Sequence, residues 1–499
     1  MTELRARLAE IADLDDVASL LAWDQQTMMP AGGAQARAEQ RATLGRITHE
    51  RLACDDLARL LAELEPYEQG LEAGCDEASL LRVTRRDHER ARRVPSDLHT
   101  AMALAAASAI PVWVEARARS DFALLRPHLE RQLELRRRYV DCFEDFSEPY
   151  DVLLADFEDG LDTAAARSAL EALRRGLEPL LGELRERAGA VADDCLRGHF
   201  PIDGQRRLSK RVLGQLGFDA GSWRLDQTVH PFAANPAEGD VRITTRYDER
   251  DLASALFSAI HEFGHGLYDA HIPHAYRRSP LGRIGASMSL HESQSRLWEN
   301  FVGRSPEFWQ WATPVLRDAL GPAAPRADAE TLYRAVNKVS PSLIRVEADE
   351  VTYNLHVILR FELEQELLAG TLAVAELPEA WNARMRSDLG VDVPDDARGV
   401  LQDVHWASGA FGYFPTYALG NLVAAQLWKR LHAQLPDIGA QIADGEFSSV
   451  RDWLGENLHR HGRRQTLRET LARLTGSSAL DPEPYLRYLR TKLGDVYGL

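Results

Sequence analysis

The stretch FSAIHEFGHGLYDA, residues 257–270, places two histidines four residues apart, with a glutamate directly after the first. In an α-helix, residues i and i+4 lie on one face about a turn apart, so His261 and His265 point the same way. Two imidazoles in that arrangement can bind one Zn²⁺ through ring nitrogens at about 2.1 Å. The pattern therefore predicts a metal-binding helix over about residues 250–271.

Glu262 is the residue of this helix that is suited to act as a general base. It lies about 100° round the helix from His261, so it flanks the metal instead of joining the same set of ligands. A carboxylate in that place can take a proton from the attacking water in a metal-assisted hydrolysis. Gly264, between the histidines, permits close packing against the helix. The short motif also occurs by chance, which leaves two ordinary helix histidines as the alternative.

A catalytic zinc site needs a third protein ligand and leaves a fourth position for water. Two candidates follow in SLHESQSRLWENF, residues 289–301, where Glu292 and Glu299 are seven residues apart and share a face if the segment is helical. The metzincin pattern HExxHxxGxxH is excluded, because Tyr268 stands at its glycine position. The alternative for Glu292 is a buried carboxylate that is paired with Arg296.

Helical periodicity dominates the rest of the chain. Segments such as ARSALEALRRGLEPLLGELRERAG, residues 166–189, space their leucines at three and four with charges between them. Two segments are instead alternating and β-branched, and we expect them to form strands of a small sheet, Ser222 to Phe232 and Asp240 to Tyr247. The expected architecture is mostly α-helical, a single unit over residues 1–499 with one small sheet and a deep central cleft between two helical halves.

Composition restricts the class of protein and its partners. The chain has 59 basic and 76 acidic residues, a net charge of −17, so neither nucleic acid nor an anionic membrane is an expected partner. No apolar run approaches the roughly 20 residues of a membrane span, and the polar N-terminus is not a signal-peptide pattern. We expect a cytoplasmic protein. Its four cysteines form no CxxC pair and are expected to be reduced thiols: Cys54, Cys75, Cys142 and Cys195.

Six ordered motifs, together with segments at 21–30 and 411–421, resemble the thermostable carboxypeptidase Taq family, metallopeptidase family M32. The resemblance runs from about residue 20 to the C-terminus. The six motifs are HPF at 230–232, DVRIT at 240–244, HEFGH at 261–265, HESQS at 291–295, IRVEAD at 344–349 and GVLQDVHW at 399–406.

The resemblance implies a metal site with three protein ligands. The family binds zinc, or cobalt in vitro, through the two histidines of HExxH and the glutamate of HES. Carried over to this chain, the ligands are His261, His265 and Glu292, with Glu262 as the base. Glu299 then supports a ligand or has a structural role. The resemblance also implies a helical zincin-like fold with a long, deep cleft, and a homodimer.

The implied reaction is hydrolysis of the last peptide bond of a peptide with a free C-terminus. Zinc polarises the scissile carbonyl and lowers the pKa of water towards about 7, and Glu262 moves the proton to the departing amine. The oxyanion needs a further donor, and such donors are typically worth about 10²–10³ in rate. His405, Tyr413 and Tyr417 are the candidates, with Tyr417 also a candidate for substrate binding.

Removing one C-terminal residue requires a group that recognises a free carboxylate, and arginine suits this best. Arg345, in the IRVEAD motif, is the candidate, and a salt bridge to Glu347 or Asp349 is the alternative role. His230 either contacts substrate or the water at the metal, or is a hydrogen-bonded structural histidine. Arg242 is expected to brace the sheet, and its strand could pair with an extended substrate.

Two other functions share some of these features. A helical oligoendopeptidase or dipeptidase has the same two-histidine and glutamate site, but it does not depend on a free C-terminus. A non-catalytic peptide-binding protein that keeps zinc only for structure is the second alternative. Structural zinc usually has four protein ligands, and the sequence offers three good ones.

Overall fold

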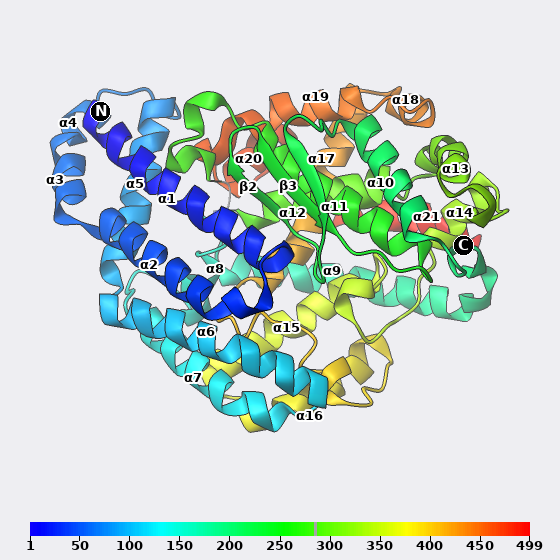
Figure 1. Ribbon diagram of the computed structural model, residues 1–499, viewed down its shortest axis with the longest axis horizontal. Coiled ribbons are helices and arrows are strands. Elements are labelled where there is room, and N and C mark those ends of the chain that lie inside the picture. The colour runs from blue at the N-terminus through cyan, green and yellow to red at the C-terminus, as the bar shows by residue number, and fades with distance from the viewer. Residues whose placement is uncertain (284–286) are drawn as a thin grey trace.

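The computed structural model describes residues 1–283 and 287–499, and most of them are helical (Figure 1). The helices of the first half of the chain begin on the left and lower side of Figure 1, in blue to cyan, and the last of them lies at the upper right. These helices are α1 (Thr2–Thr27), α2 (Ala34–Ala53), α3 (Asp55–Glu63), α4 (Glu65–Glu68), α5 (Asp76–Arg93), α6 (Ser96–Arg119), α7 (Phe122–Val140), α8 (Pro149–Leu154), α9 (Thr163–Glu186) and α10 (Ile202–Leu216).

Helix α9 shows how the leucine spacing builds these elements. The side chain of Asp162 accepts a hydrogen bond from the backbone N–H of Ala165, which caps the first turn. The leucines of one face, from Leu170 to Leu184, are buried, as a 3.6-residue period requires. The apolar stripe of the sequence is therefore the face that packs into the core.

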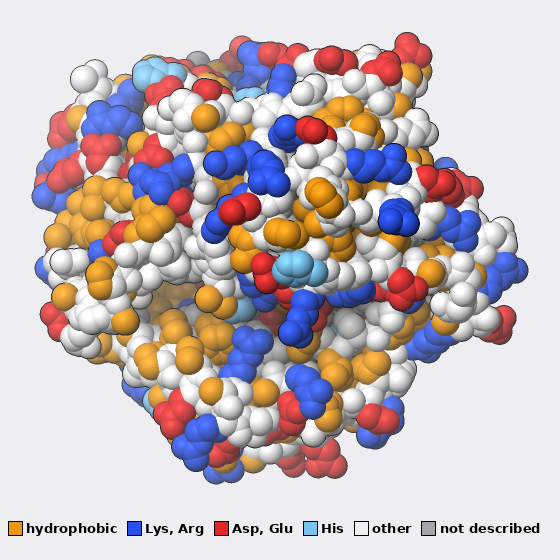
Figure 2. All heavy atoms as spheres, turned by 45° about the vertical axis from the view of Figure 1, so that its right-hand side comes forward, with side chains coloured by type: hydrophobic (Ala, Val, Ile, Leu, Met, Phe, Trp, Pro, Cys, Tyr) orange, Lys and Arg blue, Asp and Glu red, His pale blue; other side chains and the backbone are white. Residues whose placement is uncertain are grey.

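The second half of the chain contributes the remaining helices, beginning with α11. They are α11 (Leu252–Ala270), α12 (Met288–Arg296), α13 (Pro306–Leu320), α14 (Ala329–Val336), α15 (Thr352–Ala369), α16 (Leu377–Arg384), α17 (Phe414–Gln434), α18 (Ile438–Ala443), α19 (Ser448–Asn457), α20 (Leu467–Thr475) and α21 (Glu483–Tyr497). The mostly helical class is confirmed, and Figure 2 shows a hollow across one face with Lys and Arg side chains along it.

A sheet of three strands lies just before α11, in the order β1–β3–β2. Strand β1 (Trp223–Gln227) pairs in parallel with β3 (Asp240–Thr245), and β2 (Ala233–Ala237) pairs with β3 in antiparallel orientation. The two predicted strands are present but shorter than expected. Strand β2 was not predicted, because its sequence AANPA is a turn-like composition, and an edge strand tolerates the proline.

The central place of β3 corrects one expectation about substrate binding. Both edges of β3 are already paired, with β1 and with β2, so the strand that carries Arg242 has no free edge for a peptide. Arg242 instead pairs with Asp240 at 2.7 Å and lies over the ring of Trp23 on α1. Arg242 therefore links β3 to the N-terminal helix α1, and its predicted role in bracing the sheet stays a prediction.

Helix α6 differs from the prediction that no segment is apolar and long enough to span a membrane. Among the described residues, Ser96–Arg119 meets that test by length and composition, with a mean hydropathy of 1.2 in its best window, of which 17% is buried. Length and composition alone are weak evidence for a span. The predicted free thiols are confirmed, since all four cysteines are unpaired.

Candidate metal centre and active site

Three side chains from two helices converge on one point. The nearest ligand atoms of His261, His265 and Glu292 all lie within 4.8 Å of one another. The Oε2 atom of Glu292 is 3.7 Å from Nε2 of His261 and 3.4 Å from Nε2 of His265. Ligands at about 2.1 Å from a tetrahedral Zn²⁺ are about 3.4 Å apart, so the donor set and its spacing fit this ion.

Helix α11 presents the two histidines from a firmly anchored scaffold. The side chain of Asp251 caps its N-terminus by accepting from the backbone N–H groups of Ala253 and Ser254. The observed helix, Leu252–Ala270, agrees with the predicted 250–271. Its apolar face is buried, so the polar face that carries the histidines is the one left open to a metal.

Two glycines allow the helices to approach one another at the ligands. A Cβ atom on Gly264 would lie 2.5 Å from the backbone oxygen of Gln294, so the absence of a side chain lets α11 and α12 touch. A Cβ atom on Gly420 of α17 would lie 2.7 Å from Cγ of Glu292. The predicted close packing at Gly264 is confirmed, and Gly420 makes the corresponding room on the far side of Glu292.

Glu299 is not a metal ligand but holds His261 in place. After α12 the chain continues as a π-helical turn, Leu297–Val302, and this turn carries Glu299. The Nδ1 atom of His261 is 2.8 Å from Oε2 of Glu299. A proton on Nδ1 directed at that carboxylate leaves the Nε2 lone pair facing Glu292, as a metal ligand requires.

His265 is oriented by another histidine. Its Nδ1 atom is 2.5 Å from Nδ1 of His291, and Nε2 of His291 lies 3.6 Å from Asp269. Burial, reinforced by His291, lowers the pKa of His265 to about 4. His265 is therefore a neutral imidazole at pH 7, which is the form that binds a metal.

The alternative role of Glu292 as the partner of Arg296 is also present. Nε of Arg296 lies 2.7 Å from Oε1 of Glu292, while Oε2 faces the two histidines. Burial would raise the pKa of Glu292, but Arg296 and His261 lower it overall. One oxygen is thus fixed by an ion pair and the other remains available to a metal, so the two roles do not exclude each other.

Replacing Glu299 with glutamine is expected to weaken zinc binding by about 10- to 100-fold, the usual cost of losing a carboxylate that orients a ligating histidine. The amide keeps the size of the side chain, but its oxygen is a weaker acceptor of the hydrogen bond from Nδ1 of His261. Competition with a chelator measures the change. Glu3→Gln on exposed α1 is the matched control, and equal affinities in both variants would refute the orienting role.

Glu262 directly follows the ligand His261 on α11, and its role as the base stays a prediction. Its residue is 6% exposed. Burial, partly offset by His261, raises its pKa to about 7. A carboxylate with a pKa near the working pH can both accept a proton and give it up.

The candidate oxyanion donors form one cluster at the start of α17. Nε2 of His405 lies 3.1 Å from the hydroxyl of Tyr417, and the ring of Tyr413 is 5.1 Å from that of Tyr417. Burial raises the pKa of both tyrosines, and the charge of Glu292 adds to the rise. Helix α17, which begins at these residues, packs against Glu292 at Gly420. Burial, together with nearby arginines, lowers the pKa of His405 to about 3, so this imidazole is neutral.

Arg345 belongs to a buried cluster of two arginines and one aspartate. Nη2 of Arg345 and Nη2 of Arg360 each lie 2.7 Å from an oxygen of Asp403, and Nη1 of Arg345 donates to the hydroxyl of Tyr353. The expected alternative, a salt bridge from Arg345 to Glu347 or Asp349, is therefore wrong. Two guanidinium groups and one carboxylate leave one positive charge in the cluster.

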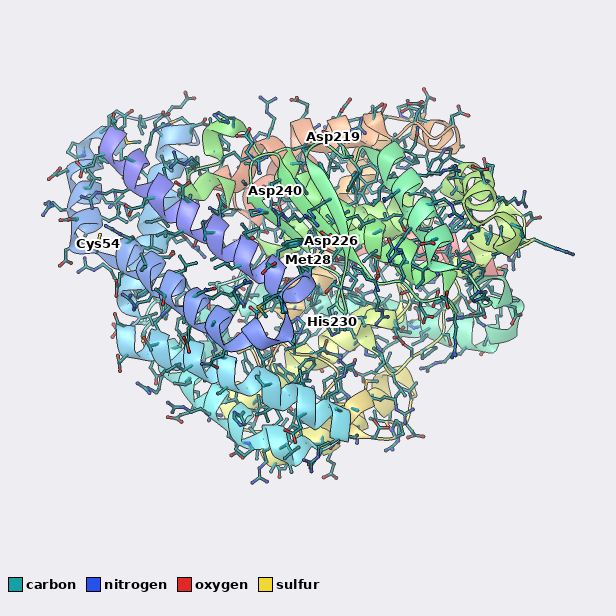
Figure 3. All side chains as sticks on the ribbon, viewed as in Figure 1. Met28, Cys54, Asp219, Asp226, His230 and Asp240 are labelled. Atoms are coloured by element: carbon teal, nitrogen blue, oxygen red, sulfur yellow. The ribbon has the colours of Figure 1, made fainter. Side chains whose placement is uncertain are left out.

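His230 lies at the end of the sheet (Figure 3). Although the residue reaches the surface, partial desolvation by the surrounding protein lowers its pKa. The charges of Arg117 and Arg246 lower it further, while Asp403 raises it. His230 is exposed, on the segment between β1 and β2. The charges that act on His230 thus come from α6, from the end of β3 and from the segment near Arg345.

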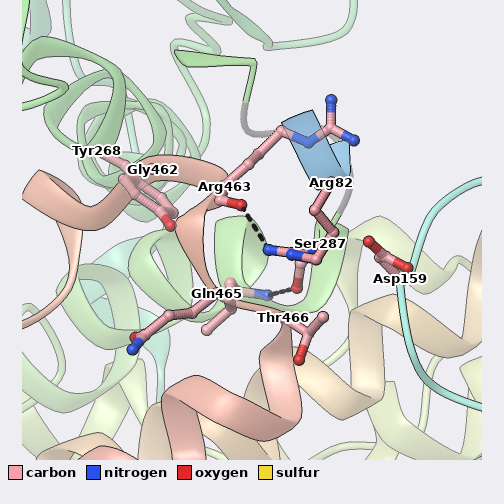
Figure 4. Close-up of a pocket in the computed structure, with 9 residues that line it drawn as sticks. Arg82, Asp159, Tyr268, Ser287, Gly462, Arg463, Gln465 and Thr466 are labelled. Carbon is pink, nitrogen blue, oxygen red and sulfur yellow. Dashed lines mark hydrogen bonds between the residues drawn. The ribbon is translucent and has the colours of Figure 1, made fainter. Parts of the chain in front are cut away.

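Two cavities lie away from this site. One of about 20 Å³, large enough for about one water, lies at the start of α12, where Ser287 accepts a hydrogen bond from the backbone N–H of Leu290 (Figure 4). The other, of about 600 Å³, lies between α1, α5 and the segment 274–283. Neither is lined by the metal ligands, so the chemistry is not located there.

Sequence reasoning left the partners of several residues around the site undetermined. His271 stands ten residues after His261, at the spacing of a metzincin ligand, but its Nδ1 faces Nδ1 of His459 at 2.9 Å and not the metal ligands. Asp403 stands inside the GVLQDVHW motif, yet only its contacts reveal that it joins Arg345 to Arg360. Arg117 and Arg246 had no motif that could have identified them.

Comparison with known proteins places the chain in a family. Residues 3–493 match the family described as Carboxypeptidase Taq (M32) metallopeptidase. Thermostable carboxypeptidase 1 of Thermus thermophilus is 39% identical over 498 residues, which cover 98% of this chain and 97% of that protein. Carboxypeptidase 1 of Bacillus subtilis is 35% identical over 490 residues, with coverage of 98% and 97%.

Solved structures agree with the sequence comparison. The crystal structure of an M32 carboxypeptidase from Deinococcus radiodurans R1 superposes with a TM-score of 0.94 at 40% identity, and the match covers 100% of this chain and 99% of that one. Sequence and fold therefore match over nearly the full length of both chains. The chain belongs to the carboxypeptidase Taq (M32) family and is a metallocarboxypeptidase.

Proposed function

We propose that the enzyme uses zinc and the base Glu262 to release C-terminal residues one at a time from peptides. The observation that supports this most directly is that the ligand Glu292 is connected to a buried cluster with a surplus positive charge. Arg296, which pairs with Glu292, lies 4.1 Å from the centroid of the Tyr353 ring, and the hydroxyl of Tyr353 accepts from Arg345. The donor set suits a hydrolytic metal, and the surplus charge suits a substrate carboxylate. Zinc as the native metal, a homodimer and a cytoplasmic location remain predictions.

Glu262 carries the proton in this proposal. Zinc held by the three ligands would supply Lewis acidity and acidify the attacking water. Glu262 accepts the proton from water and then delivers it to the amine of the departing residue. Its raised pKa, about 7, lets one carboxyl serve both steps at neutral pH.

Arg345 is proposed to recognise the terminal carboxylate. Asp403 neutralises only one of its two arginines, so the cluster can accept a second negative charge. Arg360 is completely buried, whereas the side chain of Arg345 is 6% exposed. Arg117 and Arg246, whose charges act on His230, add to the attraction. A carboxylate paired in this way aligns the last peptide bond with the metal ligands.

The tyrosine cluster is proposed to stabilise the oxyanion. Tyr413 and Tyr417 lie at the start of α17, which packs against Glu292 at Gly420, and burial raises the pKa of each, so both hydroxyls are protonated donors. Neutral His405 accepts from Tyr417 or donates to it, which orients that hydroxyl. Phe157 packs edge-on against Tyr413 at 5.0 Å and limits its motion. Tyr413 is therefore the first choice as donor, with His405 and Tyr417 positioning the substrate around it.

A pair of peptides tests the proposed specificity. The two share one sequence, and one ends in a free carboxylate while the other ends in an amide. With zinc-loaded enzyme we expect kcat/KM to fall by about 10²–10³ for the amide, since a buried charged contact is worth about 2–5 kcal/mol. Mass spectrometry of the free peptide should show a ladder that loses one C-terminal residue at a time.

The controls separate the proposed function from its alternatives. Acetylating the N-terminus of the free peptide should leave the rate unchanged, because the opposite end is recognised. Equal rates for amide and carboxylate would overturn the carboxypeptidase mechanism and favour an oligoendopeptidase. Release of residue pairs would favour a dipeptidase.

A further inference from the structure

The π-helical turn Leu297–Val302 determines where Glu299 points, and it is held from outside. The backbone N–H of Gly303 donates to the carbonyl of Trp298 at 2.8 Å, a spacing of five residues. Such wide turns are rare, are found mostly at functional sites, and pack less regularly than an α-helix. What stabilises this turn therefore affects the contact between Glu299 and His261.

The C-terminal helix α21 supplies that support with two side chains one turn apart. The hydroxyl of Tyr488 lies 3.0 Å from the carbonyl oxygen of Asn300, and Nζ of Lys492 donates to the same oxygen at 3.3 Å. The ring of Tyr488 also stacks on Phe301, with centroids 4.0 Å apart. These contacts are made with Asn300 and Phe301, the two residues that follow Glu299.

Glu350 joins Tyr488 and Lys492, and we call these three residues the clamp. Its Oε1 atom lies 2.5 Å from Nζ of Lys492, and its Oε2 atom lies 3.1 Å from the hydroxyl of Tyr488. That hydroxyl has one proton and donates it either to Oε2 of Glu350 or to the carbonyl of Asn300. The side chains of Lys492 and Glu350 are 7% and 11% exposed. A buried ion pair stabilises only one arrangement of its partners, because its cost of desolvation is recovered only where every donor is satisfied. The carbonyl of Asn300 is part of that arrangement.

We propose that Lys492 is a positioning residue of the metal centre, which acts through the carbonyl of Asn300 to hold Glu299 against His261. Asn300 directly follows Glu299, so a shift of its carbonyl also moves the carboxylate that is 2.8 Å from Nδ1 of His261. The last helix of the chain would thus set the affinity for the metal. This inference rests on the proposed zinc site.

Lys492→Met and Tyr488→Phe test the clamp. Lys492→Met keeps much of the apolar stem, and Tyr488→Phe keeps the stacking on Phe301 while losing the hydroxyl. In the full-length protein we expect zinc to bind about 5- to 20-fold more weakly in Lys492→Met, within the range found for outer partners of metal ligands. The loss in Tyr488→Phe should be smaller. Competition with a chelator measures it, and the visible absorption of Co²⁺ bound at the site should shift.

A double-mutant cycle separates positioning from general stability. If Lys492 acts through Glu299, then Lys492→Met in a Glu299→Gln background should weaken zinc binding by less than about twofold more. Full additivity of the two losses would overturn the proposal. Lys429→Met, on the exposed surface of α17, is the matched control and should leave zinc binding unchanged.

The outcomes separate failure of the proposed zinc site from failure of the positioning role of Lys492. If the wild-type protein binds no zinc, the proposed function fails and the clamp has no metal to act on. If wild type binds zinc and both Lys492→Met and Tyr488→Phe bind it equally well with unchanged Co²⁺ absorption, the positioning role is refuted while the zinc site stands. If Lys492→Met does not fold, Tyr488→Phe and its cycle with Glu299→Gln decide the question.

Discussion

Replacing Glu262 with glutamine is expected to lower kcat by about 10²–10⁴ without changing the zinc content of the protein. A positioned general base contributes about that much to the rate, and glutamine cannot accept the proton. Glu262 is not among the clustered ligand atoms of the site, so the metal should stay bound. Steady-state kinetics and metal analysis of the same preparation measure the two quantities.

Two controls decide what a loss of activity in Glu262→Gln means. Glu292→Gln removes a ligand and should lower the zinc content together with the rate, in contrast to Glu262→Gln. A Glu262→Asp variant keeps the carboxyl but draws it back by one methylene, and it should retain more activity than the glutamine variant. Unchanged kcat in Glu262→Gln would remove this residue from the mechanism.

Replacing Arg345 with methionine should reduce kcat/KM for a free peptide by about 10²–10³ and abolish the preference over the C-terminal amide. The loss follows from removing the charge that is expected to hold the carboxylate, worth about 2–5 kcal/mol in a buried site. The fold should tolerate the change, since Asp403 keeps one guanidinium partner in Arg360. Rates with both peptides and chemical denaturation of the variant measure the effect.

Arg360→Met provides a matched comparison because it removes the same charge from the same cluster. Arg360 is completely buried and donates to the backbone of His356, so it is not expected to touch the substrate. Its loss should affect stability more than the choice between carboxylate and amide. If both variants lose that preference equally, the net charge of the cluster matters and not contact by Arg345. An unchanged preference in Arg345→Met would refute its role.

The local elements of the site were predictable because they depend on neighbouring residues. Helix α11 follows from a capping aspartate and an apolar face of regular period, and its bounds agree with the prediction to within two residues at the N-terminus and one at the C-terminus. The strand containing Arg242 was predictable for the same reason. Strand β2 was missed because its pairing with β3, and not its own composition, makes it a strand.

The ligand set was predictable in part and for a different reason. His261 and His265 share a face by helix geometry alone, but Glu292 belongs to another helix, and the choice between it and Glu299 depended on resemblance. The two glutamates are seven residues apart, which would place both on one face of a regular helix. The π-helical turn changes the direction in which Glu299 points. The carboxylate of Glu292 therefore faces Nε2 of His261, and the carboxylate of Glu299 faces Nδ1.

The amino-acid sequence by itself determined a helix with two histidines, a base beside them and the class of chemistry they support, because spacing along one helix fixes direction. Tertiary structure alone decided the partner of Arg345, the surplus charge near His230 and the contact of Lys492 with the turn that carries Glu299. Those depend on which distant elements share a buried volume, where an unpaired charge is costly and each polar group must find a partner. Sequence spacing carries no information about that choice.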